Sequence, residues 1–572
     1  MDRGTKILRG TMALVFGAGV YLLFALACKY HIHFQEQNQM FLFSWEYFRE
    51  VAAVPGGFAD WVGRFLTQFF YYAYAGAALI ALVAVAVQYL TCRAAGGRCG
   101  LLYALSFLPA AACALYMLDE NALMGAPVAV LLSLSAVVLL GLVRNFRLRI
   151  VLWLVLVPVL YFLLGPLSAI FLLCGLRWAF DVHSPVCAIL AVALFFALPL
   201  LLQFELQYPL QRLLTGIHYH RYHHAVPVMP WAAVVFAVGV YWCGMAKRCP
   251  SGLSHLVVFA LVLAAAGLYA GKSYDGSKEE AMKYDFMVRF NMWNRIISTA
   301  QVKSPSMPMT VTSLNIALAK NGLLPDMQFD FFQNGPDGLF PKFTRDFLSP
   351  LPTAELYYHL GMINTAQRFT FEAQEAIPDF QKSARCYKRL AQTNIINGDY
   401  EVARRYLLKL QQTLFYRDWA LEAEKLLWNE PAIDSHPEYG SLRKLRYHDH
   451  DFLFSDSETD SMLGLLYTEN RDNSMAFDCM LSWLLLSKNL PRFAECLSLK
   501  AYAKLPAAYQ EALLILHLNG GGNFDNAPLY ISQDVRMLLS NLLAARNQKV
   551  PESAIEARFG KTYSYYYLYR YQ

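Results

Sequence analysis

The chain has 572 residues, of which 56% are hydrophobic and 16% are charged, and its formal net charge is +6. This balance differs from that of soluble proteins and indicates a membrane protein. No run of Lys and Arg is dense enough for a nucleic-acid-binding patch, so nucleic acid is excluded as a partner. Charges are sparse from Ile7 to Gly271 and common from Lys272 onward. The sequence therefore predicts a membrane domain at residues 1–271 and a soluble domain at residues 272–572.

Nine apolar segments in the first domain approach the length of about 20 residues that a membrane-spanning helix needs. They are Ile7–Cys28, Phe69–Thr91, Gly100–Leu118, Val128–Val143, Ile150–Gly165, Leu167–Phe180, Pro185–Phe204, Met229–Met245 and Ser254–Ala270. Leu167–Phe180 is short and contains Arg177, so it either spans fully or forms a re-entrant piece. The first segment has no cleavage site after it, and we expect it to be retained as an anchor.

The short turns between the predicted spans are basic, and Lys and Arg accumulate on the cytoplasmic side of a membrane. The basic turns are at residues 92–100, 144–149 and 246–252. With nine crossings, the amino terminus is cytoplasmic, and the loops 30–68, 119–127 and 205–228 face outward. The topology predicts a multi-pass protein of the bacterial inner membrane, in contact with membrane lipids, with a periplasmic carboxy-terminal domain.

The soluble domain has apolar residues at intervals of three and four, which indicates helices. Its clearest unit is Gln381–Thr413, where two such helices flank an Asn-Gly-Asp turn at Asn397–Asp399. Helix pairs of this kind are typical of tetratricopeptide repeats. We therefore predict an all-α protein, with a polytopic membrane domain of about nine spans followed by a tetratricopeptide-like α-solenoid. The solenoid either binds a partner on its concave surface or caps the membrane domain.

The first outward loop is too polar to cross a bilayer and is rich in aromatic residues. His33, Glu36 and Asn38 lie close to the end of the first span. A carboxylate in this place is able to act as a base on an acceptor group when its surroundings tune its pKa; the alternative is a simply solvated segment. The following residues form an apolar stripe that is typical of an amphipathic helix at the membrane interface: Phe41, Leu42, Trp45 and Phe48.

The third outward loop concentrates imidazole and guanidinium groups between Gln211 and Val228. The members of this group are Arg212, His218, His220, Arg221, His223 and His224. They suit binding of a lipid phosphate or pyrophosphate, binding of a divalent metal, or a plain interfacial belt. Their spacing matches no specific zinc pattern, so the sequence assigns no metal ligand, and a divalent metal ion is the one cofactor candidate. In the second outward loop, Asp119-Glu120-Asn121 either forms a solvated turn or joins Glu36.

Three segments resemble a family of uncharacterised polytopic membrane proteins from Bacteroidota that end in a tetratricopeptide-like half. They read EQNQMFLFSWEYF, PGGFADWVGRFLTQFFY and YYHLGMINTAQRFTFEAQEAI. More distantly, the plan is similar to the GT-C glycosyltransferases, which use polyprenyl-phosphate sugars. That resemblance implies a catalytic acidic residue in the first outward loop, where Glu36 lies. The chain departs from the GT-C pattern because Gln35 and Gln37 replace the usual second acid.

Two functional hypotheses follow. In the first, the protein is a GT-C-type glycosyltransferase that moves a sugar or oligosaccharide from a polyprenyl-linked donor to a protein or glycan acceptor on the periplasmic side. Glu36 would be the base, His33 and Asn38 would contact substrate, and the cluster around Arg221 would hold the donor phosphates. In the second, the protein is a non-enzymatic inner-membrane scaffold whose helical domain recruits envelope proteins.

Overall fold

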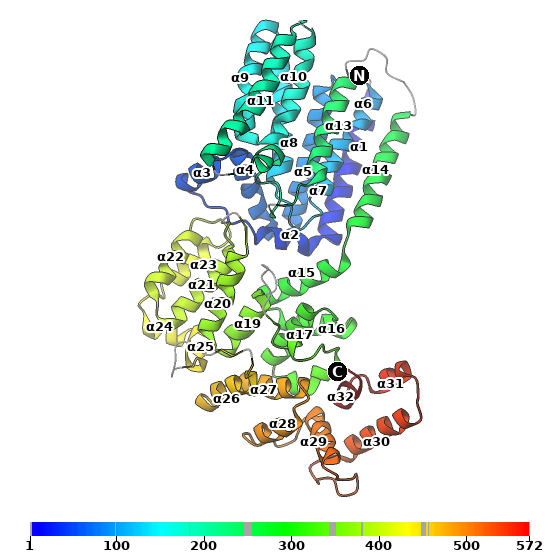
Figure 1. Ribbon diagram of the computed structural model, residues 1–572, viewed down its shortest axis with the longest axis vertical. Helices are drawn as coiled ribbons and strands as arrows, with labels where there is room; N and C mark the ends of the chain where they lie inside the picture. Colours follow the sequence, from blue (N-terminus) through cyan, green and yellow to red (C-terminus); the bar gives the residue numbers. More distant parts are fainter. Residues whose placement is uncertain are drawn as a thin grey trace. The chain divides into compact units, whose positions relative to one another are not determined.

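The computed structural model is built from helices (Figure 1). It describes residues 3–97, 99–181, 183–206, 208–222, 224–244, 254–342, 350–378, 381–447, 454–455 and 457–570. These residues include no strand, and a single isolated bridge joins Ala122 to His220. The predicted all-α class is therefore confirmed for the part of the chain that the structure describes.

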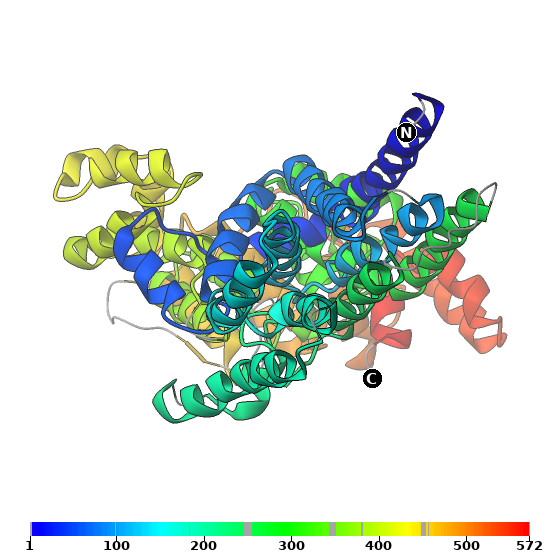
Figure 2. The ribbon, with the colours of Figure 1, turned by 90° about the horizontal axis from the view of Figure 1, so that it is seen from above.

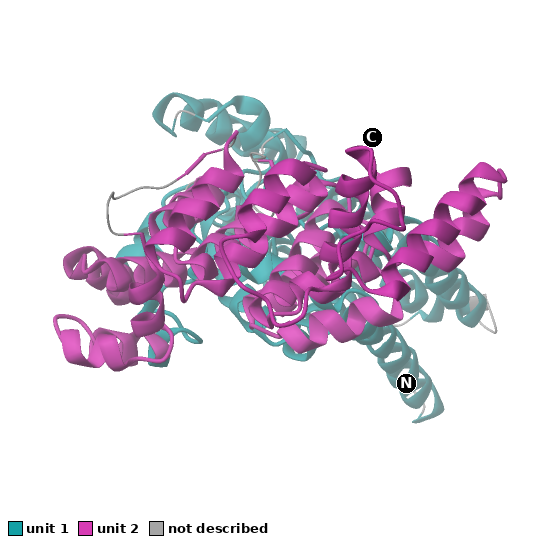
Figure 3. Ribbon diagram, turned by 90° about the horizontal axis from the view of Figure 1, so that it is seen from below, with its two compact units in different colours: residues 1–279, 377–384, 409–418 teal, residues 280–376, 385–408, 419–572 magenta. Residues whose placement is uncertain are grey.

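The chain forms two compact units, which Figure 3 shows in separate colours. Unit 1 consists of residues 1–279 together with two short segments from the second half, residues 377–384 and 409–418. Unit 2 consists of residues 280–376, 385–408 and 419–572. The packing unit that contains the apolar helices thus extends beyond the change in composition at residue 271.

Unit 1 contains the long apolar helices, which Figure 1 shows from the side and Figure 2 from above. In chain order its helices are α1 (Arg3–Leu22), the π-helical turn η1 (Leu23–Ala27), α2 (Lys29–Glu36), α3 (Trp45–Ala52), α4 (Gly57–Thr67), η2 (Gln68–Tyr71), α5 (Ala73–Ala94), α6 (Gly100–Leu105), α7 (Phe107–Tyr116), α8 (Gly125–Gly141), α9 (Phe146–Leu164), η3 (Pro166–Ser168), α10 (Ala169–Asp181), α11 (Pro185–Leu206), α12 (Leu210–Thr215), α13 (Val228–Gly244) and α14 (Ser254–Ser273). Helix α5 packs against α1, α7 and α8, and α13 packs against α7. The following helix, α15 (Gly276–Arg289), contains the boundary between the units.

Five helices in the described part of the chain are long and apolar enough to cross a membrane, judged by length and composition. They are Arg3–Ala27, Ala73–Ala94, Phe146–Leu164, Pro185–Leu206 and His255–Ser273. This number is smaller than the nine spans predicted. Three other predicted spans correspond to shorter apolar helices at Gly100–Tyr116, Gly125–Gly141 and Val228–Gly244. The predicted span Leu167–Phe180 corresponds to the 13-residue helix α10, which at 1.5 Å per residue is too short for the hydrocarbon core.

Unit 2 is a succession of shorter helices, three of which have one or two end residues in the later segments of unit 1. These are α16 (Trp293–Val302), α17 (Pro308–Lys320), α18 (Leu324–Met327), η4 (Gln328–Asp330), η5 (Pro336–Gly338), α19 (Pro350–Leu360), α20 (Ile363–Glu375), α21 (Ala384–Asn397), α22 (Tyr400–Leu410), α23 (Arg417–Glu424), α24 (Glu430–Ser435), α25 (Tyr439–Leu445), α26 (Thr459–Glu469), α27 (Ser474–Leu486), α28 (Leu490–Leu497), α29 (Ala507–Asn519), α30 (Gln533–Asn547), α31 (Glu552–Phe559) and α32 (Tyr563–Tyr569). Several consecutive helices pack against each other, most extensively α19 with α20 and α26 with α27. In the predicted unit at 381–413, α21 and α22 flank Gly398, whose positive φ of 89° suits glycine in a tight turn.

Candidate functional site

The polar stretch after α1 is buried rather than solvated. Helix α1 ends in the turn η1, the backbone turns at Cys28, and α2 then carries the polar residues (Figure 1). Glu279, at the start of α15, accepts the backbone N–H groups of Tyr30 and His31 at 2.6 and 3.2 Å. A carboxylate at this position satisfies N–H groups that the first turn of a helix leaves without partners. The contact fixes where α2 begins.

Glu36 lies at the carboxyl end of α2 and is only 6% exposed. The hydroxyl of Tyr416 donates to its Oε1 at 3.4 Å. Two backbone hydrogen bonds fix the chain that follows: Met40 N–H donates to Lys382 O, and Phe43 N–H donates to Gln412 O, each at 2.8 Å. Both acceptors belong to the two segments that the second half of the chain contributes to unit 1. Glu36, the predicted catalytic carboxylate, is therefore covered by these two segments.

The amphipathic helix expected after this stretch is α3. Ser44 caps it by accepting the N–H of Tyr47 at 3.2 Å. Trp45 is 68% exposed and Glu46 is exposed, whereas Phe41 and Leu42 are buried. The predicted apolar stripe is thus divided between the interior of unit 1 and its surface.

All three predicted outward loops meet at residues 119–121. The side chain of Gln35 donates from Nε2 to Asp119 O at 3.0 Å, which connects α2 to the second loop. From the third loop, His220 Nε2 lies 3.0 Å from Asp119 Oδ2, and Arg221 N–H donates to Asn121 O at 2.9 Å. The turn that was expected either to be solvated or to join Glu36 is the point at which the loops converge.

His220 connects Asp119 to Tyr222. Its Nε2 lies 3.0 Å from Asp119 Oδ2, and its Nδ1 lies 3.1 Å from the backbone N and 3.3 Å from the backbone O of Tyr222. The other oxygen of Asp119 accepts the N–H of Asn121 at 2.8 Å. Burial alone would raise the pKa of Asp119, but the hydrogen bonds from His220 and Asn121 outweigh it and hold this pKa below its usual value. Asp119 is therefore ionised at neutral pH.

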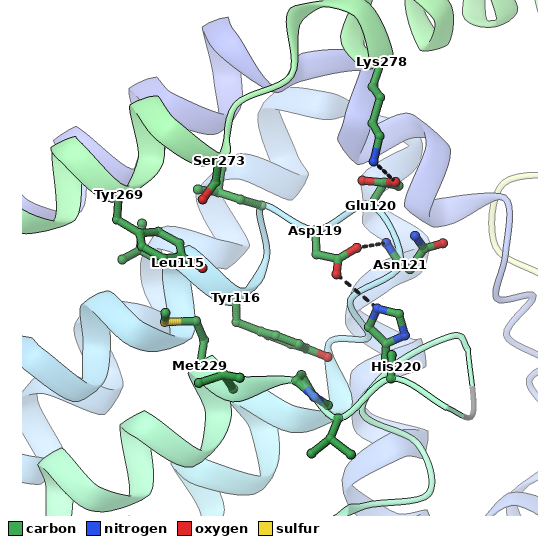
Figure 4. A pocket seen from close by; sticks show the side chains of 15 residues that line it. Leu115, Tyr116, Asp119, Glu120, Asn121, His220, Met229, Tyr269, Ser273 and Lys278 are labelled. Atoms are coloured by element: carbon green, nitrogen blue, oxygen red, sulfur yellow. Dashed lines mark hydrogen bonds and ion pairs between the residues drawn. The ribbon is translucent and has the colours of Figure 1, made fainter.

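A cavity of about 530 Å³ opens beside these residues (Figure 4). Its polar wall consists of Asp119, Glu120, Asn121, His220 and Lys278. Its apolar wall comes from the ends of α7, α13 and α14 and the loop before α13: Leu115, Val226, Val228, Met229 and Tyr269. Lys278 Nζ lies 2.7 Å from Glu120 Oε1, whereas Asp119 faces the space with its side chain 47% exposed. The cavity thus combines carboxylates with an apolar surface at the ends of apolar helices.

The other residues predicted to bind substrate are mostly buried. Arg212 Nη2 donates to Ile217 O at 2.8 Å, and Arg221, which is 4% exposed, lies over the rings of Phe34 and Tyr222. His218 Nδ1 lies 3.9 Å from Asp60 Oδ2. Of the remaining members, His33 is 6% and Asn38 is 2% exposed, and His224 is exposed and stacks on Tyr222. His223 lies outside the described residues. Among the members described, His220 alone lines the cavity.

A buried ion pair that the sequence did not reveal lies beside the same loop. Asp60 Oδ2 and Arg64 Nη2, one turn apart on α4, are 2.7 Å apart, and the two residues are 1% and 9% exposed. Arg64 also donates to the hydroxyl of Tyr47 at 3.3 Å. Helix α4 approaches α8 closely, because a Cβ on Gly63 would lie 2.5 Å from Gly125 N. Spacing of i and i+4 on an amphipathic helix was the available signal, but it is shared by ordinary solvated pairs.

No group of three or more His, Cys, Asp or Glu residues in the described ranges is arranged to hold a metal ion. In the described ranges, nine cysteines form no disulfide bond and are dispersed over both units, whereas Cys99 is disulfide-bonded. Neither the curated proteins nor the solved structures include a match to the chain. A model for a family of unknown function, DUF6057, matches residues 4–570. The chain therefore belongs to the family of unknown function DUF6057.

Proposed function

We propose that this protein is a membrane-embedded transferase of the GT-C type, which moves a sugar or oligosaccharide from a polyprenyl-linked donor to an acceptor. The observation that supports the proposal is the cavity at Asp119, where carboxylates and an imidazole adjoin an apolar wall formed by helix ends. A lipid-linked sugar has the same division, with an apolar chain and a polar headgroup. A ligand of this kind would place its chain along Val228 and Met229 and its headgroup near Asp119.

In this proposal Asp119 takes the role of base. The acceptor hydroxyl gives its proton to the carboxylate while its oxygen bonds to the anomeric carbon, and the bond from that carbon to the donor phosphate breaks. His220 donates a hydrogen bond to Asp119 and thereby orients the carboxylate. Lys278, held by Glu120, is the one Lys or Arg among the described lining residues and would bind the departing phosphate. A divalent cation, where one takes part, would bind at Asp119 and Glu120.

Glu36 is the base that the sequence and the GT-C resemblance favour, and the structure offers a reason to prefer Asp119. Glu36 is 6% exposed and hydrogen-bonded by Tyr416, whereas Asp119 borders the cavity and is about half exposed. A general base has to come within hydrogen-bond reach of the proton that it removes. We therefore assign Glu36 a positioning role, through α2, in the proposal.

The proposed topology places the cavity on the outer face of a bacterial inner membrane. The basic turns support this orientation, and the helical hairpins of unit 2 would then form a periplasmic, tetratricopeptide-like solenoid that presents a protein or glycan acceptor. Accessibility of single introduced cysteines to an impermeant thiol reagent in whole cells tests the orientation. If cysteines in unit 2 were labelled only after the inner membrane had been permeabilised, the proposed orientation would be refuted.

The experiment that tests the function compares carboxylate variants in a strain that lacks the chromosomal gene. Envelope glycoconjugates are measured by lectin blotting, and protein abundance by immunoblotting. We expect Asp119→Asn to abolish the glycoconjugate that depends on the gene, Glu36→Gln to reduce it, and the exposed control Glu46→Gln to leave it unchanged. A deletion with no effect on any glycoconjugate refutes the transferase proposal, and full activity of Asp119→Asn refutes the assigned base.

The scaffold is the second candidate function, and one observation favours it. Unit 2 exposes large apolar side chains close together in sequence before and on α30, with Leu529 99%, Tyr530 57% and Met537 49% exposed. Exposed apolar groups of this kind mark sites of protein association. A scaffold predicts stoichiometric co-purification of an envelope protein that is lost in Leu529→Ser and retained in Asp119→Asn. The transferase proposal predicts that glycoconjugate formation is lost in Asp119→Asn and retained in Leu529→Ser.

A further inference from the structure

Unit 2 contains a second cavity of about 440 Å³, within the range of roughly 300–1,000 Å³ that is usual for small-molecule sites. One side is the segment Phe329–Gln333, which follows α18, and the other side is the chain from Glu556 to Arg570, which includes α31 and α32. All of its lining residues belong to unit 2. The cavity is therefore a property of that unit alone.

Aromatic rings form the floor and one rim of this cavity. Phe329 is buried, and its ring centroid lies 5.0 Å from that of Tyr563 and 5.3 Å from that of Tyr566. These contacts pack Phe329 against α32. Phe332 is 37% exposed and so presents a ring to solvent at the rim, where the guanidinium of Arg570 lies 5.8 Å from the ring centroid. An aromatic face that borders a cavity is a surface on which a flat ligand can stack.

The polar groups of the cavity carry charges of both signs. Glu556 forms an ion pair with Arg570, which also lies 5.6 Å from the ring of Tyr565. Asp330 is an exposed carboxylate, and Lys561 is an exposed ammonium. The backbone at Phe332 is anchored, because its N–H donates to the hydroxyl of Ser304 at 3.1 Å. Hydrogen-bond acceptors and donors thus surround the aromatic surface.

This combination selects among ligand classes. The lining places the carboxylates of Asp330 and Glu556 beside three cations, Arg558, Lys561 and Arg570. A lining with charges of both signs favours a neutral polar ligand over a phosphate or a purely apolar molecule. A pyranose ring has one face of C–H groups that packs on an aromatic ring, and its edge carries hydroxyls that both donate and accept. Carboxylates accept from such hydroxyls, whereas Lys and Arg donate to them.

We propose that this cavity binds a carbohydrate, with one sugar ring stacked on Phe332 and its hydroxyls bonded to Asp330 and Glu556. The inference does not depend on the proposed function, because a glycan binds here whether or not unit 1 transfers sugars. A transferase would use the site to hold a glycan acceptor, and a scaffold would use it to attach to envelope glycans.

The test measures binding of neutral trisaccharides of glucose, mannose and N-acetylglucosamine to the full-length protein. The protein is placed in lipid nanodiscs, because maltoside detergents carry a sugar headgroup that would compete. Binding is followed by saturation-transfer difference NMR with increasing trisaccharide. We expect at least one trisaccharide to bind with a Kd below about 1 mM and its ring protons to receive saturation from aromatic protons.

Matched variants locate the site. We expect Phe332→Ala to weaken binding by about tenfold or more, since it removes the stacking surface. Phe371→Ala removes a ring of similar exposure, 41%, from α20, and we expect it to leave binding unchanged. Thermal unfolding of each variant establishes that the fold is intact, and Glu556→Gln provides a second test if Phe332→Ala unfolds. Absence of binding by every trisaccharide, binding that survives both cavity variants, or displacement by an acidic peptide instead of by free sugar overturns the proposal.

Discussion

Replacing Asp60 by Asn tests whether the buried ion pair of α4 holds unit 1 together. Asp60 is 1% exposed and Arg64 is 9% exposed. Burial opposes the charged form of Arg64, but Asp60 and Tyr47 together raise its pKa above the ordinary value, so the guanidinium stays charged. The variant keeps the shape of residue 60 and removes its charge. Arg64 then retains its hydrogen bond to the hydroxyl of Tyr47, 3.3 Å away.

The expected loss follows from the burial of the pair. At the 2.7 Å separation of the two charges, an effective dielectric constant of about 20 gives an attraction of roughly 6 kcal/mol. Breaking a buried pair by removing one partner costs about 3–5 kcal/mol, because the other charge stays buried. For a unit of this size, about 2 °C of Tm corresponds to each kcal/mol. We therefore expect Asp60→Asn to lower the Tm of the full-length protein in detergent by at least about 6 °C.

Two controls separate the ion pair from other effects. Arg368 and Glu372 form a pair with the same i, i+4 spacing at 3.0 Å, but their side chains are 42% and 26% exposed, so Glu372→Gln should cost less than about 1 kcal/mol. The double change Asp60→Leu with Arg64→Met removes both buried charges and should recover most of the lost Tm. A Tm for Asp60→Asn as high as that for Glu372→Gln would refute the reasoning.

Three further predictions use the same measurement of thermal unfolding. Gly63→Ala places a Cβ 2.5 Å from a backbone nitrogen of α8 and should destabilise the protein by about 1–3 kcal/mol. In the control Gly10→Ala the new Cβ has nothing within 4 Å, so this variant should be neutral or slightly stabilising. Equal Tm values for the two variants would contradict the close packing of α4 on α8. Burial raises the pKa of Glu279 to about 7 from 4.5. Between these pH values the folded protein keeps a proton that the unfolded chain has released, so the stability of the wild type relative to Glu279→Gln should fall as pH rises from about 4.5 to 7 and then level off. The prediction is wrong if the stabilities of the two proteins change with pH in parallel. Asn473 caps α27 and also donates to a carbonyl of α19 at 2.9 Å, so Asn473→Ala should lower the stability by about 2 kcal/mol or more. The control Asn489→Ala removes a helix cap alone and should cost about 1 kcal/mol. A smaller loss of stability for Asn473→Ala than for Asn489→Ala would refute the contribution of the hydrogen bond to α19.

Much of the fold could be predicted from periodicity and apolar length. The longest apolar runs form helices that are long and apolar enough to cross a membrane, and a helix satisfies its backbone hydrogen bonds within the segment. The count was less secure where a run is interrupted. Gly100–Leu118 contains a break at Ser106, between α6 and α7, and the run around Leu167 begins with a 3₁₀ turn and leaves 13 residues for α10. Hydropathy averages over such interruptions and therefore overestimates helix length.

The sequence could predict the segments that surround the candidate site better than the turn at residues 119–121 where they meet. Polar density beside apolar runs singled out α2 and the loop that carries His220, and both contact the turn at Asp119. The turn itself looks in sequence like any short polar connection. Its role arises from three-dimensional convergence, which depends on the packing of α7 and α13 and has no local sequence signal. For the same reason the sequence favoured Glu36 as the base and left Asp119 either in a solvated turn or as a neighbour of Glu36.

The residues that cover α2 come from a part of the sequence far from the apolar helices of unit 1. A buried polar stretch needs acceptors for its backbone N–H groups, because an unsatisfied group in the interior costs stability. For Met40 and Phe43 the acceptors are the carbonyls of Lys382 and Gln412. A carbonyl is supplied by every residue type, so no motif distinguishes the segments 377–384 and 409–418 as parts of unit 1. The change in composition at residue 271 marks where the apolar helices end, whereas the packing unit also includes the two later segments whose carbonyls accept from the chain that follows α2.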